Sequence, residues 1–127
     1  MNERKIDNKP NPLKEKSFQF ALNIIKLYKY LTEEKKEFIM SKQLLRSGTS
    51  IGANIREGQS AQSKPDFIHK FSIAQKECDE SLYWLELLYQ SQFIEKIEFT
   101  KIHSDATELL KMLRSSILTT KQNIHNS

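Results

Sequence analysis

Apolar residues recur every three or four positions in four separate stretches of the chain, which is the period of one face of an α-helix. The stretches span roughly residues 13–31, 32–62, 63–90 and 95–121. Helices of this length that are joined by short connections pack antiparallel against their neighbours. The pattern therefore predicts an all-α protein that folds as an up-down antiparallel four-helix bundle.

Capping residues mark two of the predicted helix starts. Thr32 is followed by two glutamates, which favour the positive end of a helix dipole, so we expect it to cap the second helix. Ser63 precedes Pro65 and has a carboxylate, Asp66, three residues after it, which is a typical start for the third helix. Both ends of the second helix are predicted in this way.

The two ends of the chain differ in composition from the bundle. Residues 1–12 are mostly polar and finish with Pro10 and Pro12, which prevent a helix from running back into this segment. We expect a disordered or extended N-terminal tail over 1–12, a single bundle over 13–122 and a frayed C-terminus over 123–127.

Two of the predicted helices carry a second apolar stripe away from their core face. The residues of these stripes are Phe18, Leu22 and Ile25 on the first helix and Ile73, Trp84 and Leu87 on the third. Placed together, the stripes form an exposed apolar patch of the kind that marks an interface between proteins. They predict a homo-oligomer, and the alternative is a broad core within one chain.

The chain has only three glycines, and all of them fall within the second predicted helix. A glycine inside a helix costs about 1 kcal/mol relative to alanine. Gly48 and Gly52 lie one turn apart, so a neighbouring helix can approach closely there. Asn54 and Glu57 lie between the core face and the polar face, and we expect them to bond a neighbouring helix. A kink or break near Gly58 is the alternative interpretation.

Charge indicates a second candidate surface. Lysine and arginine number 20 against 16 acidic residues, a formal net charge of +4. Lys42, Arg46 and Arg56 share the face of the second helix opposite its core, with no acidic residue between Phe38 and Arg56. We identify these three side chains as a candidate contact with RNA or DNA, electrostatic and sensitive to salt. A mild basic excess also fits a merely solvated surface.

The sequence gives no pattern of catalysis or of metal binding. The single cysteine, Cys78, falls on an apolar stripe and is expected to be a buried structural thiol. The three histidines lack a ligand at helical spacing, so we predict no metal, no cofactor and no enzyme. An enzyme would need a pocket lined by Glu57, Glu80 or His69.

No targeting or membrane segment is recognisable. The chain has no apolar run of about 18 residues, so no transmembrane helix is predicted. Its polar start lacks the apolar region of a signal peptide. These features predict a cytoplasmic protein that makes no contact with a membrane.

One segment carries a family resemblance. Ser50, Asn54, Glu57 and Gly58, followed by Glu80, fit a pattern of Ser-Ile/Val-x-x-Asn-Ile-Ala-Glu-Gly with a later glutamate. Further matches are Gln43, Arg46, Ile51, Ile55, Ser63, Lys64, Phe67, Ile68 and Ala74. The chain thereby resembles the bacterial 23S ribosomal RNA intervening-sequence protein family of four-helix bundles. It departs from the pattern at Arg56, where the family commonly has alanine.

The resemblance implies a bundle that assembles as a ring of five. The family is also similar to the accessory proteins of diversity-generating retroelements, which are basic pentameric bundles that bind nucleic acid and a reverse transcriptase. It brings no catalytic residues. We therefore expect a non-enzymatic, homopentameric scaffold that binds nucleic acid through its basic stripe. The alternative is an adaptor for a protein partner encoded by a neighbouring gene, such as a reverse transcriptase, without nucleic-acid contact.

Overall fold

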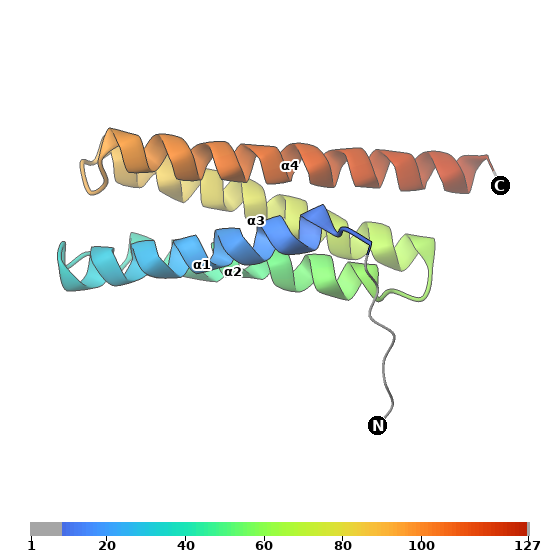
Figure 1. Cartoon of the computed structure of the whole chain (residues 1–127), viewed down its shortest axis with the longest axis horizontal. Coiled ribbons are helices and arrows are strands. Elements are labelled where there is room, and N and C mark those ends of the chain that lie inside the picture. The colour runs from blue at the N-terminus through green and yellow to red at the C-terminus, as the bar shows by residue number, and fades with distance from the viewer. Residues whose placement is uncertain (1–8, 127) are drawn as a thin grey trace, which may run out of the picture.

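The computed structural model describes residues 9–126, and in that part of the chain it shows four helices and no strand (Figure 1). The helices are α1 (Pro12–Glu33), α2 (Met40–Gln59), α3 (Lys64–Gln90) and α4 (Lys96–His125). The connections α1–α2 and α3–α4 lie at one end of the bundle, and the connection α2–α3 lies at the other. The predicted all-α, up-down bundle is confirmed.

The helices pack in ring order. Helix α2 packs along α1 and α3, and α3 packs along α4, whereas α1 and α4 meet over a shorter seam. Within residues 9–126, α1 makes no close backbone contact with α3, so these two helices are diagonal. The order positions α2 between the two helices that carry second apolar stripes.

The core runs the length of the bundle, with a contribution from every helix. The largest fully buried side chains include Phe20, Ile24 and Leu31 from α1, Leu44, Ile51 and Ile55 from α2, Phe71, Leu85 and Leu88 from α3, and Leu109 and Leu113 from α4. Cys78 is fully buried among them, and its thiol donates a hydrogen bond to the carbonyl of Ala106 at 3.1 Å. Burial raises the pKa of this thiol to about 12, so the predicted inert structural cysteine is confirmed.

The side chain of the residue directly before the helix caps α1 and α3. The Ser63 hydroxyl accepts the backbone N–H of Asp66 at 3.2 Å, as predicted for α3. At the start of α1, the Asn11 side chain accepts the N–H of Lys14 at 3.2 Å. Both caps satisfy a backbone donor that has no partner inside its own helix.

The predicted start of the second helix at Thr32 is wrong. Helix α1 continues through Thr32 to Glu33, and the Thr32 hydroxyl donates to the carbonyl of Tyr28 at 2.9 Å, one turn back in the same helix. Residues 34–39 then form the connection, and α2 begins at Met40. A threonine followed by acidic residues fits a helix interior as well as a cap when its hydroxyl bonds the preceding turn.

The residue that caps α2 is Glu37. One carboxylate oxygen accepts the N–H groups of Ile39 and Met40 at 3.1 and 3.0 Å, and the other accepts that of Ser41 at 2.7 Å. Glu37 is only 8% exposed. Burial acts to raise the pKa of the carboxyl, but hydrogen bonds from Met40, Ser41 and Ile39 outweigh it and lower the pKa below its ordinary value.

The helix ends also differ from the prediction. Helix α2 ends at Gln59, three residues before the expected Gln62, and α4 continues past Lys121 to His125. Residues 123–125, expected to be frayed, are therefore helical. Residues 1–8 of the predicted tail and residue 127 lie outside the described part of the chain.

Close helix approach explains the glycines of α2. A Cβ atom on Gly48 would lie 2.9 Å from the Ile24 side chain of α1, and one on Gly58 would lie 2.6 Å from the Phe71 ring of α3. At Gly52 the nearest atom, the hydroxyl oxygen of Ser17, would be 3.3 Å away. The glycines therefore let both neighbouring helices approach the backbone of α2, and α2 remains helical through Gly58.

Candidate functional site

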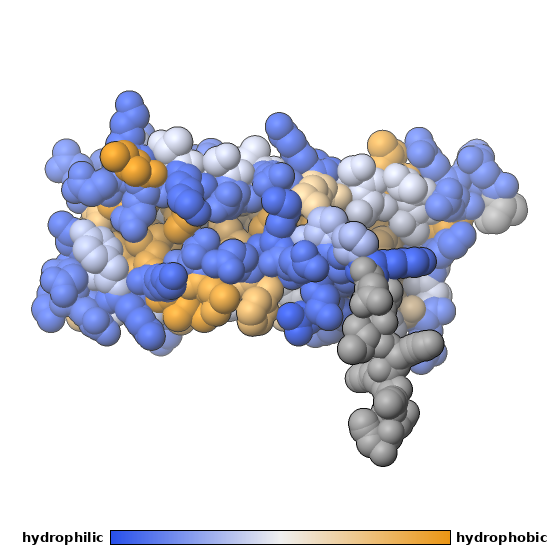
Figure 2. All heavy atoms as spheres, in the orientation of Figure 1, coloured by the Kyte–Doolittle hydropathy of each residue, from blue (hydrophilic) through white to orange (hydrophobic). Residues whose placement is uncertain are grey.

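The second apolar stripe of α1 is exposed on the side that faces α2. Phe18 is 53% exposed and Leu22 is 39% exposed, and Ile25 is also exposed. The guanidinium of Arg56 on α2 lies over the Phe18 ring, 5.2 Å from its centroid. Figure 2 shows apolar surface over α1 and α2 along the lower edge of the bundle. The core of a single chain leaves this stripe uncovered.

The second stripe of α3 lies on the other flank of α2. Leu87 is exposed, whereas Ile73 and Trp84 are half-buried. The indole N–H of Trp84 donates to Glu80 at 3.0 Å, and Glu80 also pairs with Arg46 of α2. This contact orients the α3 stripe towards α2.

The two stripes belong to two adjacent faces of the bundle. One face is formed by α1 and α2, the other by α2 and α3, and α2 forms the edge between them. The expected single patch is therefore corrected, because α1 and α3 are diagonal in an up-down bundle. Each molecule presents two distinct apolar surfaces.

Arg46, one of the three candidate nucleic-acid contacts, is held in an ion-pair network. Its guanidinium pairs with Glu77 at 3.2 Å and with Glu80 at 2.5 Å, both on α3. The hydrogen bond to Glu80 raises the pKa of Arg46, and the bonds from Arg46 and Trp84 lower the pKa of Glu80. Two carboxylates offset this positive charge, so Arg46 connects α2 to α3.

Lys42 and Arg56 have different surroundings. Both side chains are exposed on the outer side of α2. Among the described residues, neither forms a salt bridge with a carboxylate. Of the predicted basic stripe, these two residues therefore present uncompensated charge to solvent.

The family-motif residues act within the bundle. Glu57 pairs with Lys70 of α3 at 2.9 Å and raises the pKa of that lysine, as expected for a residue that ties two helices together. Asn54 does not do so, because its amide donates to the carbonyl of Ser50 in its own helix at 2.9 Å. The Ser50 hydroxyl donates in turn to the carbonyl of Arg46 at 2.6 Å.

Sequence reasoning missed one buried polar contact in the same region. The hydroxyls of Ser47 on α2 and Ser81 on α3 are fully buried and lie 2.8 Å apart. Both positions follow the core spacing of their helices, which is the signal that identifies them. With Gly58 packed on Phe71, this pair fixes the α2–α3 seam, so the motif region serves helix packing.

The residues that an enzyme would require have separate surroundings. Glu57 pairs with Lys70, Glu80 pairs with Arg46, and His69 is exposed on α3. Within residues 9–126 no group of three or more histidine, cysteine or acidic side chains could hold a metal ion. No acid–base pair for catalysis is assembled from these residues.

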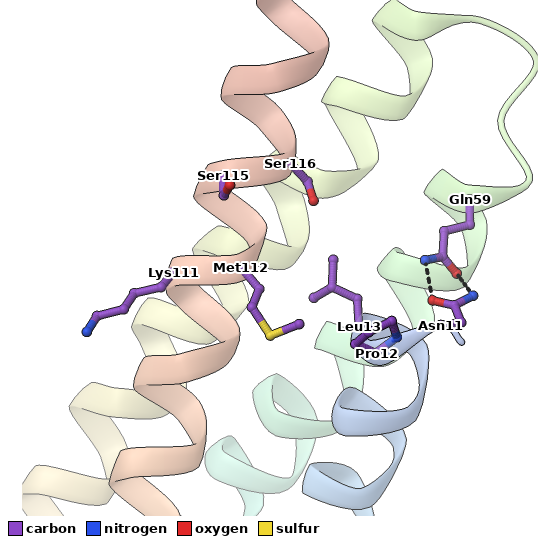
Figure 3. A pocket seen from close by; sticks show the side chains of 8 residues that line it. All are labelled: Asn11, Pro12, Leu13, Gln59, Lys111, Met112, Ser115 and Ser116. Atoms are coloured by element: carbon purple, nitrogen blue, oxygen red, sulfur yellow. Dashed lines mark hydrogen bonds between the residues drawn. The ribbon is translucent and has the colours of Figure 1, made fainter. Parts of the chain in front are cut away.

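An open groove of about 460 Å³ lies between the start of α1 and the later part of α4 (Figure 3). Leu13 and Met112 point into it from opposite sides, and the amides of Asn11 and Gln59 bond each other at its edge. Lys111 is the one charged residue of its lining among the described residues. The groove offers an apolar surface without paired titratable groups.

None of the four helices carries an apolar stretch of the length needed to cross a bilayer, over the residues that the structure describes.

Comparison with known proteins identifies relatives that match most of the bundle. The family model described as 23S rRNA-intervening sequence protein matches residues 11–115. A solved structure from Bacteroides thetaiotaomicron VPI-5482, described as a protein of unknown function from the S23 ribosomal protein family, is 55% identical. The match covers 83% of this chain and 97% of that chain, with a TM-score of 0.82. A search of curated proteins found no match.

Proposed function

The chain belongs to the 23S rRNA-intervening sequence protein family, and we propose that it acts as a non-enzymatic scaffold, a ring of five copies that binds nucleic acid. The observation that carries this proposal is the pair of apolar stripes on two adjacent faces that share α2, the α1 stripe exposed and the α3 stripe exposed at Leu87 and half-buried at Ile73 and Trp84. Monomeric proteins rarely expose a contiguous apolar surface of this kind. Where one is exposed, it commonly marks an interface with another protein, because contact with that protein shields the apolar side chains from water.

The positions of the stripes favour a ring. A contact between two different faces is head-to-tail, and such contacts close into a ring when the rotation between neighbours divides a full turn. The α1–α2 face carries the exposed stripe of Phe18, Leu22 and Ile25, whereas the α2–α3 face carries Trp84 and the ion pairs of Arg46 with Glu77 and Glu80. Because the two faces differ in composition, pairing of one face with the other is favoured over pairing of like faces. The number of five comes from the family resemblance.

The nucleic-acid contact rests on charge. Each copy has a formal charge of +4, and a ring repeats the exposed Lys42 and Arg56 in every copy. Contacts of this kind neutralise phosphates and read no bases, so binding is tolerant of sequence and weakens steeply with salt. Arg46 contributes less, because its charge is offset by Glu77 and Glu80.

Two measurements test the proposal separately. We expect light scattering after gel filtration to give five times the monomer mass of 14.9 kDa. We expect fluorescence polarisation to show binding of short RNA and DNA at low salt, with affinity falling as salt increases. A monomeric mass contradicts the scaffold, and absence of binding at low salt contradicts the nucleic-acid contact.

A second candidate function, an adaptor for a protein partner such as a reverse transcriptase, is favoured by a different surface. Phe38 and Ile39 are 58% and 77% exposed in the α1–α2 connection, and Ile97 at the start of α4 is 87% exposed. Both segments lie at the same end of the bundle (Figure 1). Co-purification with the product of a neighbouring gene, abolished by Ile39→Ser and Ile97→Ser substitution, would favour the adaptor.

A further inference from the structure

A small cavity of about 300 Å³ lies where the start of α1 meets the end of α2. Its lining consists of two cations and three neutral polar side chains: Lys14, Arg56, Asn11, Gln59 and Ser60. No carboxylate is among these residues. We propose that this cavity binds a phosphate group, and this inference rests on the proposed function only for the source of that phosphate.

The two amides in the lining of the cavity are held in place by each other. Asn11 and Gln59 donate to each other, with distances of 3.2 and 2.9 Å between amide nitrogen and oxygen (Figure 3). The Asn11 oxygen also accepts the N–H of Lys14. Each NH₂ group carries two hydrogens and uses one in this pair, which leaves a second donor on each side chain. The cavity therefore has neutral donors in a fixed arrangement, and the Ser60 hydroxyl adds another.

The two cations of the cavity are not offset by acidic partners. Among the described residues, neither Lys14 nor Arg56 forms a salt bridge, and the neighbouring Glu57 pairs with Lys70. The Phe18 ring under Arg56 limits the positions of its guanidinium. Helix α1 begins at Pro12, so the positive end of its dipole adds to the same field.

Phosphate is the ligand that fits this combination. The planar guanidinium of Arg56 can donate two parallel hydrogen bonds to phosphate oxygens. The ammonium of Lys14 adds a positive charge, which favours an anionic ligand over a neutral one. The phosphate can belong to a nucleic-acid backbone or to a free phosphate or phosphate ester. On this assignment, Lys14 joins Arg56 in the contact, and the contact lies at the end of the bundle away from Lys42.

The test compares two variants of equal charge. Lys14→Gln with Arg56→Gln removes one lysine and one arginine from the cavity, and Lys26→Gln with Arg114→Gln removes the same charges from exposed positions elsewhere. The probes are a short single-stranded RNA, the same sequence with a neutral methylphosphonate backbone, and inorganic phosphate. RNA binding is followed by fluorescence polarisation, and phosphate binding by thermal unfolding against chloride of equal ionic strength.

We expect the cavity variant to raise the Kd for RNA about tenfold or more at low salt, and the control variant to raise it much less. The logarithmic slope of affinity against salt becomes shallower by about 0.7 for each phosphate of a single strand that the variant no longer neutralises. We also expect inorganic phosphate to raise the Tm of the wild type and of the control variant, but not of the cavity variant. We expect the methylphosphonate probe to bind none of the three proteins.

Failure of this inference is distinguishable from failure of the proposed function. If RNA binds the wild type and both variants alike, or if both variants lose affinity equally, the cavity is not the site although nucleic-acid binding stands. If RNA does not bind but phosphate stabilises only proteins with an intact cavity, the site stands and its ligand is a free phosphate. If neither probe binds, both ideas are overturned. If the double variant changes the oligomer mass, the single variant Lys14→Gln decides, because it leaves the contact between Arg56 and the Phe18 ring intact.

Discussion

Glu37 caps the start of α2, although glutamate is not among the residues that commonly cap helices. Its carboxylate gathers three backbone N–H groups of the first turn and is itself shielded from water. Sequence reasoning selected Thr32 because a threonine before acidic residues is the more frequent cap. That Glu37 and not Thr32 caps α2 could not be predicted from the sequence, because it depends on which side chain the fold buries beside the first turn of α2.

We expect Glu37→Gln to lower the free energy of unfolding by about 1–3 kcal/mol, because an amide cannot accept all three N–H groups and leaves a buried donor unpaired. Urea unfolding at a fixed protein concentration measures this change. The exposed neighbour Glu34 provides the control, and Glu34→Gln should have almost no effect. Equal losses in the two variants would contradict the role of Glu37 as the cap.

The same residue predicts a pH dependence. The folded pKa of Glu37 lies below the value of the unfolded chain, which is about 4.3 for glutamate. Its ionised form therefore stabilises the fold above that pH, and the contribution is lost as the pH falls through the lower, folded pKa. We expect the difference in unfolding free energy between wild type and Glu37→Gln to shrink in this range. A difference that stays constant between about pH 7 and about pH 3 would be inconsistent with an ionised cap.

At the scale of the helix, the glycines of α2 show which packing contacts the periodicity of the sequence can predict and which it cannot. Their spacing on one face was sufficient to predict close approach at Gly48 and Gly52. It did not identify the partners, because the rotation of α1 and α3 about their own axes is decided by packing. Arg46 illustrates the same limit, since its helical position indicated a solvent-facing cation while Glu77 and Glu80 of α3 lie within ion-pair distance.

We expect the glycines to differ sharply in their tolerance of alanine. A methyl group on Gly58 would overlap the ring of Phe71, which is buried in the core and cannot move away freely. Gly58→Ala should cost about 1–3 kcal/mol, as overpacking of a core does. Gly52→Ala meets no atom closer than the Ser17 hydroxyl at 3.3 Å and gains helix propensity, so its effect should stay within about 1 kcal/mol.

Urea unfolding of both variants checks this contrast. A third protein, Gly58→Ala with Phe71→Leu, removes the ring that the new methyl group meets. It should show a smaller loss than the sum of the two single changes, because contacting residues are not additive. Equal effects of Gly52→Ala and Gly58→Ala would show that α3 does not approach α2 as closely as described.

For the whole molecule, the apolar pattern was sufficient to predict the up-down bundle and the uncovered stripe of α1, whereas Ile73 and Trp84 of the α3 stripe are half-buried. It placed the stripes of α1 and α3 together, whereas the ring order of an up-down bundle makes these helices diagonal. This arrangement changes the expected assembly. A single patch would favour a dimer in which like faces pair, whereas two different faces favour a head-to-tail ring.

Lysine substitutions on the two faces should each break the assembly. Leu22→Lys places a charge on the α1–α2 face and Leu87→Lys places one on the α2–α3 face, where burial of an unpaired charge is unfavourable. In a head-to-tail ring every contact uses both faces, so either variant should be monomeric by light scattering. Leu118→Lys, at an exposed leucine of α4 outside both stripes, should keep the wild-type mass.

Mixing the two variants distinguishes a head-to-tail ring from pairing of like faces. The intact α2–α3 face of Leu22→Lys fits the intact α1–α2 face of Leu87→Lys, and the remaining two faces are both blocked. An equimolar mixture should therefore form a one-to-one dimer that grows no further, although each variant alone is monomeric. If like faces pair, each variant keeps one working interface, forms a dimer by itself and gains nothing from the other. That result would contradict the ring while leaving the stripes as interfaces.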